Sequence, residues 1–180
     1  MTTENVTAPN TVGWSGFREA EPGFAKVVEQ RFAKYTHHVL ATLRKDGSPR
    51  LTGLEADFRA GQLWLGMMPN SLKALDLRRD NRFALYANPG PGSEMDGGDV
   101  RVSGRALEVT DPAQIEEWAA GTPDGGLPEV FHLFRVAVEE VVRVTIEGEE
   151  IVFRTWRPGG PLRTIRRGND DAPPREDPLD

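Results

Sequence analysis

Three short strand-like segments, joined by turns too short to hold a helix, constrain this chain most. The segments 37–44, 50–59 and 62–67 are separated by an Asp-Gly pair and then by an Ala-Gly pair. Glycine-containing pairs between β-prone runs are typical of tight hairpins. Strands joined this way are antiparallel, because parallel strands need a long crossover connection. The sequence therefore predicts an antiparallel meander over this region.

More strand-like segments follow, with helices between them. Residues 82–88 and 100–110 read as strands, with Gly104 as an expected bulge, and two or three more strands are expected between 130 and 156. Helical periodicity or capping residues predict helices at the segments 24–35, 70–79 and 111–120. There is no βαβ alternation, which argues against a doubly wound nucleotide-binding fold. Six to eight antiparallel strands close most readily into a barrel, because closure removes exposed strand edges.

The ends of the chain differ from its middle. The first 23 residues carry three acidic residues and one arginine, and residues 168–180 carry five acidic residues and one arginine, which accounts for the net charge of −6. We expect a polar N-terminal arm at 1–21, one barrel domain at 22–167 and a disordered acidic tail at 168–180. Trp14 and Phe17 are the residues of the arm expected to anchor it to a surface.

Composition excludes several classes of function. The body of the chain is electrically neutral, whereas a nucleic-acid-binding protein usually carries a basic excess. No apolar run is long enough to cross a bilayer, and the N-terminus lacks the pattern of a signal peptide. With no cysteine, thiolate metal sites and thiol chemistry are excluded. We therefore expect a cytoplasmic protein without nucleic-acid or membrane partners.

The helix that begins near residue 71 carries a candidate anion site. Asn70 or Ser71 is suited to cap this helix, and Lys73 follows in its first turn. Helix N-termini attract anions, because their backbone N–H groups are unpaired and the helix dipole is positive there. A bound phosphate would explain the lysine, and a solvated surface lysine is the alternative.

Three motifs together give the chain a resemblance to a known family. They are the strand VLATLRKDGSPR, whose Pro-Arg pair starts the partner strand, the Ser-x-Lys sequence that opens the helix, and the Leu-Arg-Arg-Asp-x-Arg sequence that closes it. Over about residues 24–110 the chain resembles the pyridoxamine 5'-phosphate oxidase-like split-barrel superfamily, more narrowly its flavin/deazaflavin oxidoreductases. The resemblance implies a mainly β fold, a six-stranded antiparallel split β-barrel of the FMN-binding type. It also implies a homodimer with a cofactor in each of two clefts between the subunits.

The resemblance also implies which residues bind the cofactor. Its phosphate is expected on the second strand and the small helix, and its ring system along the third strand. The cofactor-binding residues implied in this way are Arg50, Thr52, Leu65, Gly66, Met67, Met68, Ser71 and Lys73. No protein residue is identified as catalytic, because hydride chemistry belongs to the cofactor, while the protein supplies binding and orientation.

The implied function is a flavoprotein oxidoreductase that uses FMN or the deazaflavin coenzyme F-420 to reduce or oxidise a small organic substrate. The alternative is a flavin- or deazaflavin-binding carrier, sensor or stress protein without turnover. The chain departs from the family's C-terminal Arg-x-His motif, since no histidine follows His132, so oxidation of pyridoxamine phosphate itself is not implied. Trp156, Arg157 and Arg163 lie in that region and are candidates to reach a cofactor or substrate across the dimer; the alternative for Arg157 is a surface residue beside a buried tryptophan.

The histidines are weak metal candidates. His37 and His38 are adjacent on an expected strand, so their side chains point to opposite faces and cannot share one ion. Only His132 remains to assist either of them. We therefore predict no metal site, and a haem-binding relative that uses His38 and His132 stays open as the lesser alternative.

Overall fold

The computed structural model describes residues 10–91, 97–121 and 130–179. The described part of the chain contains four helices: α1 (Trp14–Ala20), α2 (Pro22–Ala33), α3 (Leu72–Arg79) and α4 (Pro112–Ala119). Its strands are β1 (Val12–Gly13), β2 (His37–Leu43), β3 (Pro49–Arg59), β4 (Gln62–Met67), β5 (Arg82–Tyr86), β6 (Asp99–Glu108), β7 (His132–Glu147), β8 (Glu150–Trp156), β9 (Arg163–Arg167) and β10 (Arg175–Glu176). None of the helices in these ranges is long and apolar enough to cross a bilayer.

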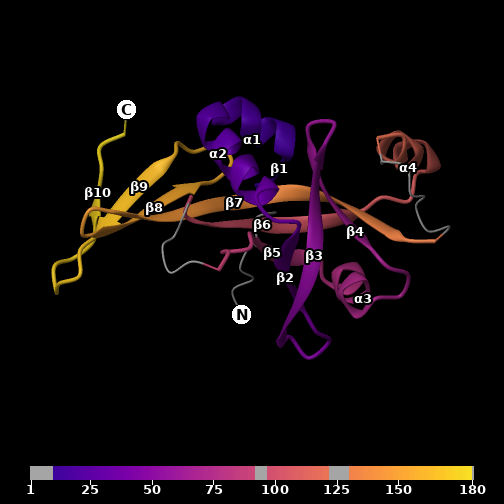
Figure 1. Ribbon diagram of the computed structural model, residues 1–180. Coiled ribbons are helices and arrows are strands. Elements are labelled where there is room, and N and C mark those ends of the chain that lie inside the picture. The colour runs from indigo at the N-terminus through magenta and orange to yellow at the C-terminus, as the bar shows by residue number, and fades with distance from the viewer. Residues whose placement is uncertain (1–9, 92–96, 122–129, 180) are drawn as a thin grey trace, which may run out of the picture.

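Six of the strands close into a barrel. Hydrogen bonding runs in the order β7, β4, β3, β2, β5 and β6, and β6 then pairs with β7 again. All of these pairs are antiparallel. The predicted six-stranded antiparallel split barrel is therefore confirmed, and the meander over the first three of its strands has the expected hairpin turns (Figure 1).

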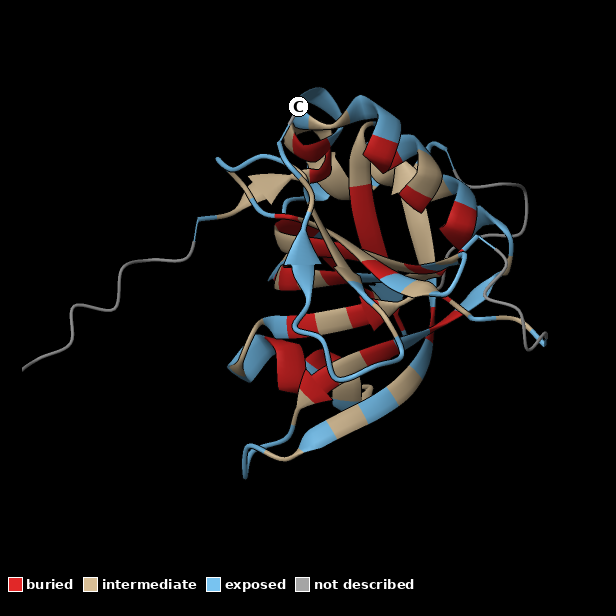
Figure 2. Ribbon diagram, turned by 90° about the vertical axis from the view of Figure 1, so that its left-hand side faces the viewer, coloured by how far each residue is buried: buried red, intermediate tan, exposed pale blue. Residues whose placement is uncertain are grey.

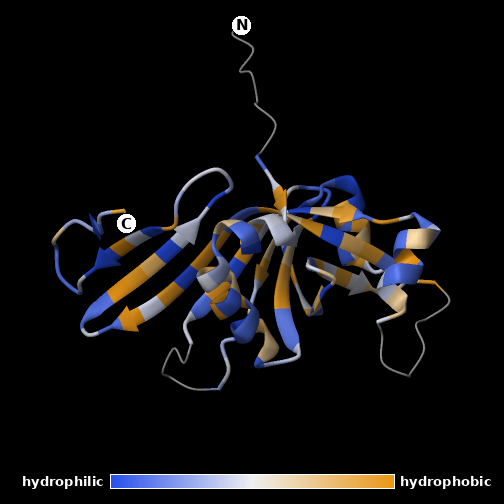
Figure 3. Ribbon diagram, turned by 90° about the horizontal axis from the view of Figure 1, so that it is seen from above, coloured by the Kyte–Doolittle hydropathy of each residue, from blue (hydrophilic) through white to orange (hydrophobic). Residues whose placement is uncertain are grey.

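The barrel strands alternate between a buried and an accessible face. Along β2 the side chains of His38, Leu40 and Thr42 are buried, while His37 and Val39 are exposed. This period of two is the pleat of a half-buried strand. Figure 3 shows the same alternation of hydrophobic and hydrophilic residues along the long strands, and Figure 2 shows the buried positions as bands across the ribbons.

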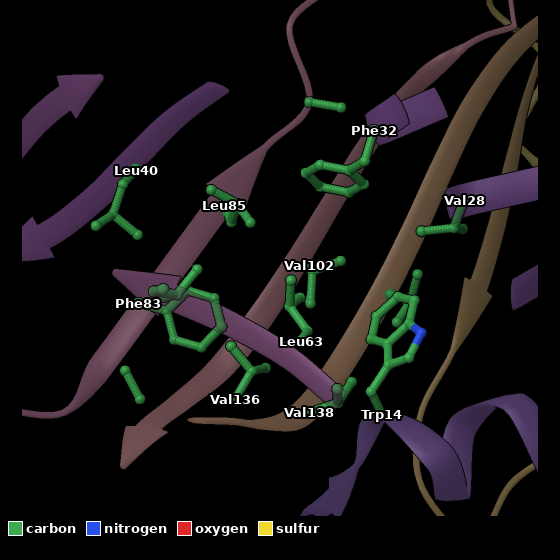
Figure 4. Packing of buried hydrophobic residues seen from close by; sticks show 14 of the residues in the cluster. Trp14, Val28, Phe32, Leu40, Leu63, Phe83, Leu85, Val102, Val136 and Val138 are labelled. Carbon is green, nitrogen blue, oxygen red and sulfur yellow. The ribbon is translucent and has the colours of Figure 1, made fainter. Parts of the chain in front are cut away.

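Helices lie on opposite sides of the barrel. In Figure 1, α1 and α2 lie above β7, and α3 lies below it, beside β3. Buried residues of α1 and α2 pack against apolar residues of the barrel interior (Figure 4). The residues that Figure 4 labels in this core are Trp14, Val28, Phe32, Leu40, Leu63, Phe83, Leu85, Val102, Val136 and Val138.

Strand β7 is one continuous strand of 16 residues. We expected two or three strands between 130 and 156, and the structure has two there, β7 and β8. The partner strand β6 follows it by a bulge, because the register shifts between Ser103 and Gly104 and leaves Glu139 without a partner on β6. A Cβ at Gly104 would lie 2.1 Å from the carbonyl oxygen of Ala137, so glycine is required there. The expected bulge is confirmed, and it lets the long strand bend instead of break.

Both ends of the chain differ from the expected arm and tail. Residues 1–9 and 180 lie outside the described residues, but β1 pairs with β7, and Trp14 and Phe17 in α1 are fully buried. Their aromatic rings add to the core and do not merely anchor an arm to a surface. At the other end, β10 pairs with β9, where Arg163 and Arg166 form ion pairs with acidic residues of the tail. The acidic composition of the tail did not reveal these pairs, because each arginine and its acidic partner lie on different strands or segments of the chain.

Candidate anion-binding site

The chain passes from β4 to α3 through a tight turn, and the side chain at the N-cap position does not cap the helix. Asn70 has φ of 54°, in the left-handed region that asparagine tolerates better than most residues. Ser71 occupies the N-cap position with φ of −60° and ψ of 141°, but its hydroxyl makes no capping hydrogen bond. The Ser71 hydroxyl therefore accepts no hydrogen bond from the first-turn N–H groups of α3.

Two hydroxyl groups near this turn are buried and unpaired. Ser71 Oγ and Thr52 Oγ1 have no hydrogen-bond partner among the described residues. Thr52 lies opposite the buried Leu40 in the β2–β3 register and shares its face of β3 with Arg50, which bonds to Asp76 of α3. A buried polar atom without a partner costs about 1–3 kcal/mol, and such atoms are rare in native proteins. Two of them in one region indicate a site that a polar ligand completes.

Lys73 joins the two elements that carry these hydroxyls. Its Nζ donates a hydrogen bond of 2.6 Å to the carbonyl oxygen of Gly53, the residue after Thr52 on β3. Burial lowers the pKa of Lys73, because the ammonium group loses part of its hydration. No carboxylate among the described residues pairs with it. A partly desolvated cation without a counter-ion, next to two unpaired hydroxyls and a helix N-terminus, is suited to an anion.

Arg50 is bound differently from the expectation of a free phosphate ligand. Its Nε donates to Asp76 Oδ2 at 2.7 Å, and the same carboxylate accepts from Thr42 Oγ1 at 2.9 Å and from Arg79 at 3.0 Å. Burial alone would raise the pKa of Asp76, but these three hydrogen bonds outweigh burial and lower it. Arg50 therefore fixes α3 to the barrel through Asp76.

The third strand presents only part of the expected ring-binding face. Leu65 and Met67 are buried in the core, whereas Gly66 and Met68 are exposed, as the pleat of β4 and its exit require. A Cβ at Gly66 would lie 3.9 Å from the Trp118 ring, so α4 lies over this outer face. Leu65 and Met67 can offer a ligand on that face only their backbone groups.

A polar chain that the sequence did not reveal supports the turn. Arg78 on α3 donates to Glu108 at 2.7 Å, and Glu108 lies 3.0 Å from His132 Nδ1. The other ring nitrogen, Nε2, accepts from the backbone N–H of Asn70 at 3.1 Å. These residues come from α3, β6, β7 and the turn, and only the pairing of the strands brings them together. No local motif could have announced the contact.

The three histidines have separate surroundings, and the described residues contain no group of three or more histidine, cysteine or carboxylate side chains that could hold a metal ion. His37 is exposed and His38 is buried, as expected for adjacent strand residues. His38 Nδ1 accepts from the Asn88 N–H at 3.2 Å, and its ring packs against Phe32. Burial, before the nearby charges, lowers the pKa of His38.

The C-terminal candidates lie on another face. Trp156 is buried in the core, while Arg157 pairs with Glu140 at 2.6 Å and Arg163 pairs with Glu176. A hollow of about 700 Å³ lies over the outer face of β6 to β9. Its lining includes Arg101, Glu140, Phe153, Arg157, Pro161 and Arg163. Within one chain this hollow is separate from the turn before α3, so we assign the anion site by its unpaired polar atoms rather than by cavity size.

The fold and the turn before α3 define a split-barrel protein with a candidate anion site between its second barrel strand and its small helix. The family model described as pyridoxamine 5'-phosphate oxidase matches residues 24–145, well over half of the chain. The chain therefore belongs to this family. A search of curated proteins finds no match.

Solved structures share the fold. A haem-binding protein from Mycobacterium smegmatis has a TM-score of 0.55 at 20% identity; the match covers 73% of this chain and 57% of that one. Campylobacter jejuni ChuZ has a TM-score of 0.55 at 14% identity, covering 77% of this chain and 61% of that chain. A pyridoxamine 5'-phosphate oxidase-related, FMN-binding protein from Nostoc punctiforme has a TM-score of 0.53 at 14% identity, covering 83% and 96%. At these identities the likeness extends to the fold alone.

Proposed function

We propose that this protein is an oxidoreductase that binds FMN or a deazaflavin coenzyme through the cofactor's phosphate. The observation that carries the proposal is the pair of buried hydroxyls without a partner, on Ser71 and Thr52, together with the Lys73 ammonium, which bonds only to a neutral carbonyl among the described residues. Membership of the pyridoxamine 5'-phosphate oxidase family and a fold shared with an FMN-binding protein support it. When bound, a flavin or deazaflavin supplies the hydride chemistry.

The residues of this chain bind and orient the cofactor. The Ser71 and Thr52 hydroxyls would donate hydrogen bonds to the phosphate, and the Lys73 ammonium, which now bonds to the Gly53 carbonyl, would add a charge-assisted hydrogen bond. The first-turn N–H groups of α3 point the same way along the helix axis. Because Arg50 is held by Asp76, its part is to keep α3 against β3.

An absorption spectrum and a cofactor titration test the proposal directly. Protein purified without added cofactor, then titrated with FMN and with the deazaflavin, should bind one of them at micromolar concentration or better. A yellow protein with flavin fluorescence identifies FMN, and a colourless protein that binds added deazaflavin identifies the other coenzyme. A red protein with a Soret band, or one that binds neither cofactor, would contradict the proposal.

Lys73→Ala tests the assigned site. Loss of one charge-assisted hydrogen bond, worth roughly 1.5–3 kcal/mol, should weaken cofactor binding by roughly 10- to 100-fold. The apo protein should keep its melting temperature, because the cation lies at the unfavourable end of the helix dipole. Lys45→Ala removes an exposed lysine from the β2–β3 turn and serves as the matched control. Equal cofactor affinities for the two variants would show that Lys73 does not bind the cofactor.

Binding without turnover is the alternative function, and a kinetic measurement separates it from the enzyme. The reduced cofactor, bound to the protein, is mixed with a small electron acceptor such as a quinone, and its reoxidation is followed. Faster reoxidation than for the free cofactor supports an enzyme, whereas unchanged or slower reoxidation supports a carrier or sensor. Pyridoxamine 5'-phosphate is tested separately as a substrate for the oxidised cofactor. We expect no turnover of it, since the C-terminal Arg-x-His sequence is missing.

A further inference from the structure

The His132 ring connects the anion site to the opposite end of α3. Its side chain is nine-tenths buried, at 9% exposed, and both ring nitrogens have partners. Nε2 lies 3.1 Å from the Asn70 backbone nitrogen, which can only donate, so Nε2 must accept. The neutral ring then carries its proton on Nδ1, which donates to Glu108 Oε1 at 3.0 Å. One tautomer satisfies both contacts.

Glu108 selects this tautomer. Its carboxylate accepts from Arg78 Nε at 2.7 Å as well as from the ring. The hydrogen bond from Arg78 first, and that from His132 after it, hold the pKa of Glu108 below its usual range despite burial. An ionised carboxylate beside Nδ1 favours the proton on that nitrogen and leaves the Nε2 lone pair free for the turn.

The contact restrains the residue on which the helix start depends. Asn70 is in the left-handed region, which costs free energy for a residue with a side chain, and it directly precedes the uncapped N-cap Ser71. Rotation at Asn70 would redirect the Ser71 hydroxyl and the first-turn N–H groups together. Arg78 lies near the C-terminal end of the same helix, so the Arg78–Glu108–His132 chain restrains α3 at one end and its leading turn at the other.

We propose that His132 is a positioning residue of the phosphate site, which acts by accepting the Asn70 N–H at Nε2 and so fixing the turn in front of α3. This inference rests on the proposed function, because it assigns His132 a role in binding the cofactor phosphate. His132 itself touches no substrate or cofactor in this role. From the sequence, His132 was a candidate only as a haem ligand together with His38.

Two substitutions separate positioning from packing. In His132→Gln the side-chain carboxamide oxygen can take the place of Nε2, so the acceptor for Asn70 is kept while the donor to Glu108 is lost. In His132→Asn the carboxamide nitrogen can take the place of Nδ1, so the contact with Glu108 is kept while the acceptor for Asn70 is lost. Both variants remove the ring, so a purely structural role predicts similar losses in both.

Affinity for FMN and for the deazaflavin is measured by titration, with Lys73→Ala alongside. We expect His132→Asn to weaken binding about tenfold, the factor for loss of one hydrogen bond with a buried partner, and His132→Gln to stay within about threefold of wild type. Equal losses in both variants, with Lys73→Ala still defective, overturn the positioning role and leave the proposed function standing. A wild type that binds neither cofactor removes both.

The wild-type protein provides a measurement that does not depend on a variant that folds. Nitrogen NMR of the imidazole should show the proton on Nδ1, and the Asn70 amide should exchange slowly with solvent in the apo protein. An Nε2–H tautomer, or a rapidly exchanging Asn70 amide, contradicts the assignment whether or not the variants fold.

Discussion

At the scale of the residue, Asp76 attaches α3 to the barrel through Arg50 on β3 and Thr42 on β2. The carboxylate is 3% exposed and accepts hydrogen bonds from Arg50, Arg79 and Thr42. Asp76→Asn removes its charge at nearly constant shape and leaves Arg50 without a counter-ion. We expect a loss of about 1.5–3 kcal/mol in the free energy of unfolding at neutral pH, the range for hydrogen bonds to a charged group. Asp46→Asn, in the exposed β2–β3 turn, is the control and should be nearly neutral.

The effect of Asp76 should depend on pH with a definite sign. Its pKa in the folded protein lies below the ordinary 3.8, so the folded state favours the ionised form. The stabilisation is complete above the pKa of the unfolded chain and is lost as the pH falls through the lower folded value. Urea unfolding of wild type and Asp76→Asn should therefore differ most at pH 5–7 and converge below pH 3.8. A gap that widens on acidification would contradict this account.

Single residues also mark what sequence could and could not predict of the site. The positions of Ser71 and Lys73 at the start of α3 were predictable, because capping and first-turn positions are set by neighbours in the sequence, and their part in a phosphate site stays a prediction. Thr52 followed from the family resemblance, and its unpaired hydroxyl gave that resemblance a physical basis. His132 and Asp76 were not identified, because their partners are distant in the sequence. Burial also takes the side chains of Leu65 and Met67 away from any ligand on the outer face.

At the scale of the element, hairpins and helix starts were well predicted, and continuity was not. β4 has the expected bounds, and Asp111 caps α4 by accepting from the Ala113 N–H. The sequence left two or three strands open between 130 and 156. The burial of β7 does not alternate cleanly, because the strand pairs with β4 at one end and with β8 at the other. A strand that changes partners along its length changes its exposed face too, so periodicity alone cannot follow it.

The C-terminal strand β10 permits a test at the same scale. From the sequence, deletion of residues 169–180 should leave the melting temperature unchanged. The structure instead has Arg163 paired with Glu176 and Arg166 paired with Asp177. We now expect the deletion to lower the melting temperature at low salt and to change cofactor affinity little.

A full-length control separates charge from chain length in this test. Exposed ion pairs are weak and are screened by salt, so the loss of stability should shrink in about 1 M NaCl. The double substitution Glu176→Gln and Asp177→Asn keeps the full chain and should reproduce most of the low-salt loss. Identical melting curves for wild type and the deletion at low salt would restore the view of a dispensable tail.

At the scale of the whole molecule, the outer face of the barrel predicts assembly. Leu51 on β3 is 69% exposed and lies opposite Ala41 on β2, whose neighbour in the other direction is Ala84 on β5. Val39, two residues before Ala41 on the same face of β2, is also exposed. Small and apolar side chains in a row on an open sheet face are suited to burial against another protein surface. A second copy of this chain fits the proposed function, because the family resemblance implies a cofactor cleft that both subunits build.

Leu51→Glu tests this assembly. Light scattering of the wild type should give about twice the chain mass of 19.9 kDa, and the variant should shift toward 19.9 kDa, because burying a carboxylate in an apolar interface costs several kcal/mol. Ile146→Glu, at an exposed apolar position beside the β7–β8 turn, is the matched control and should remain dimeric. If cofactor clefts need both subunits, the Leu51→Glu monomer should also lose cofactor affinity while its far-UV circular dichroism stays native. A monomeric wild type that binds cofactor at full affinity would show instead that Ser71, Thr52 and Lys73 of one chain suffice.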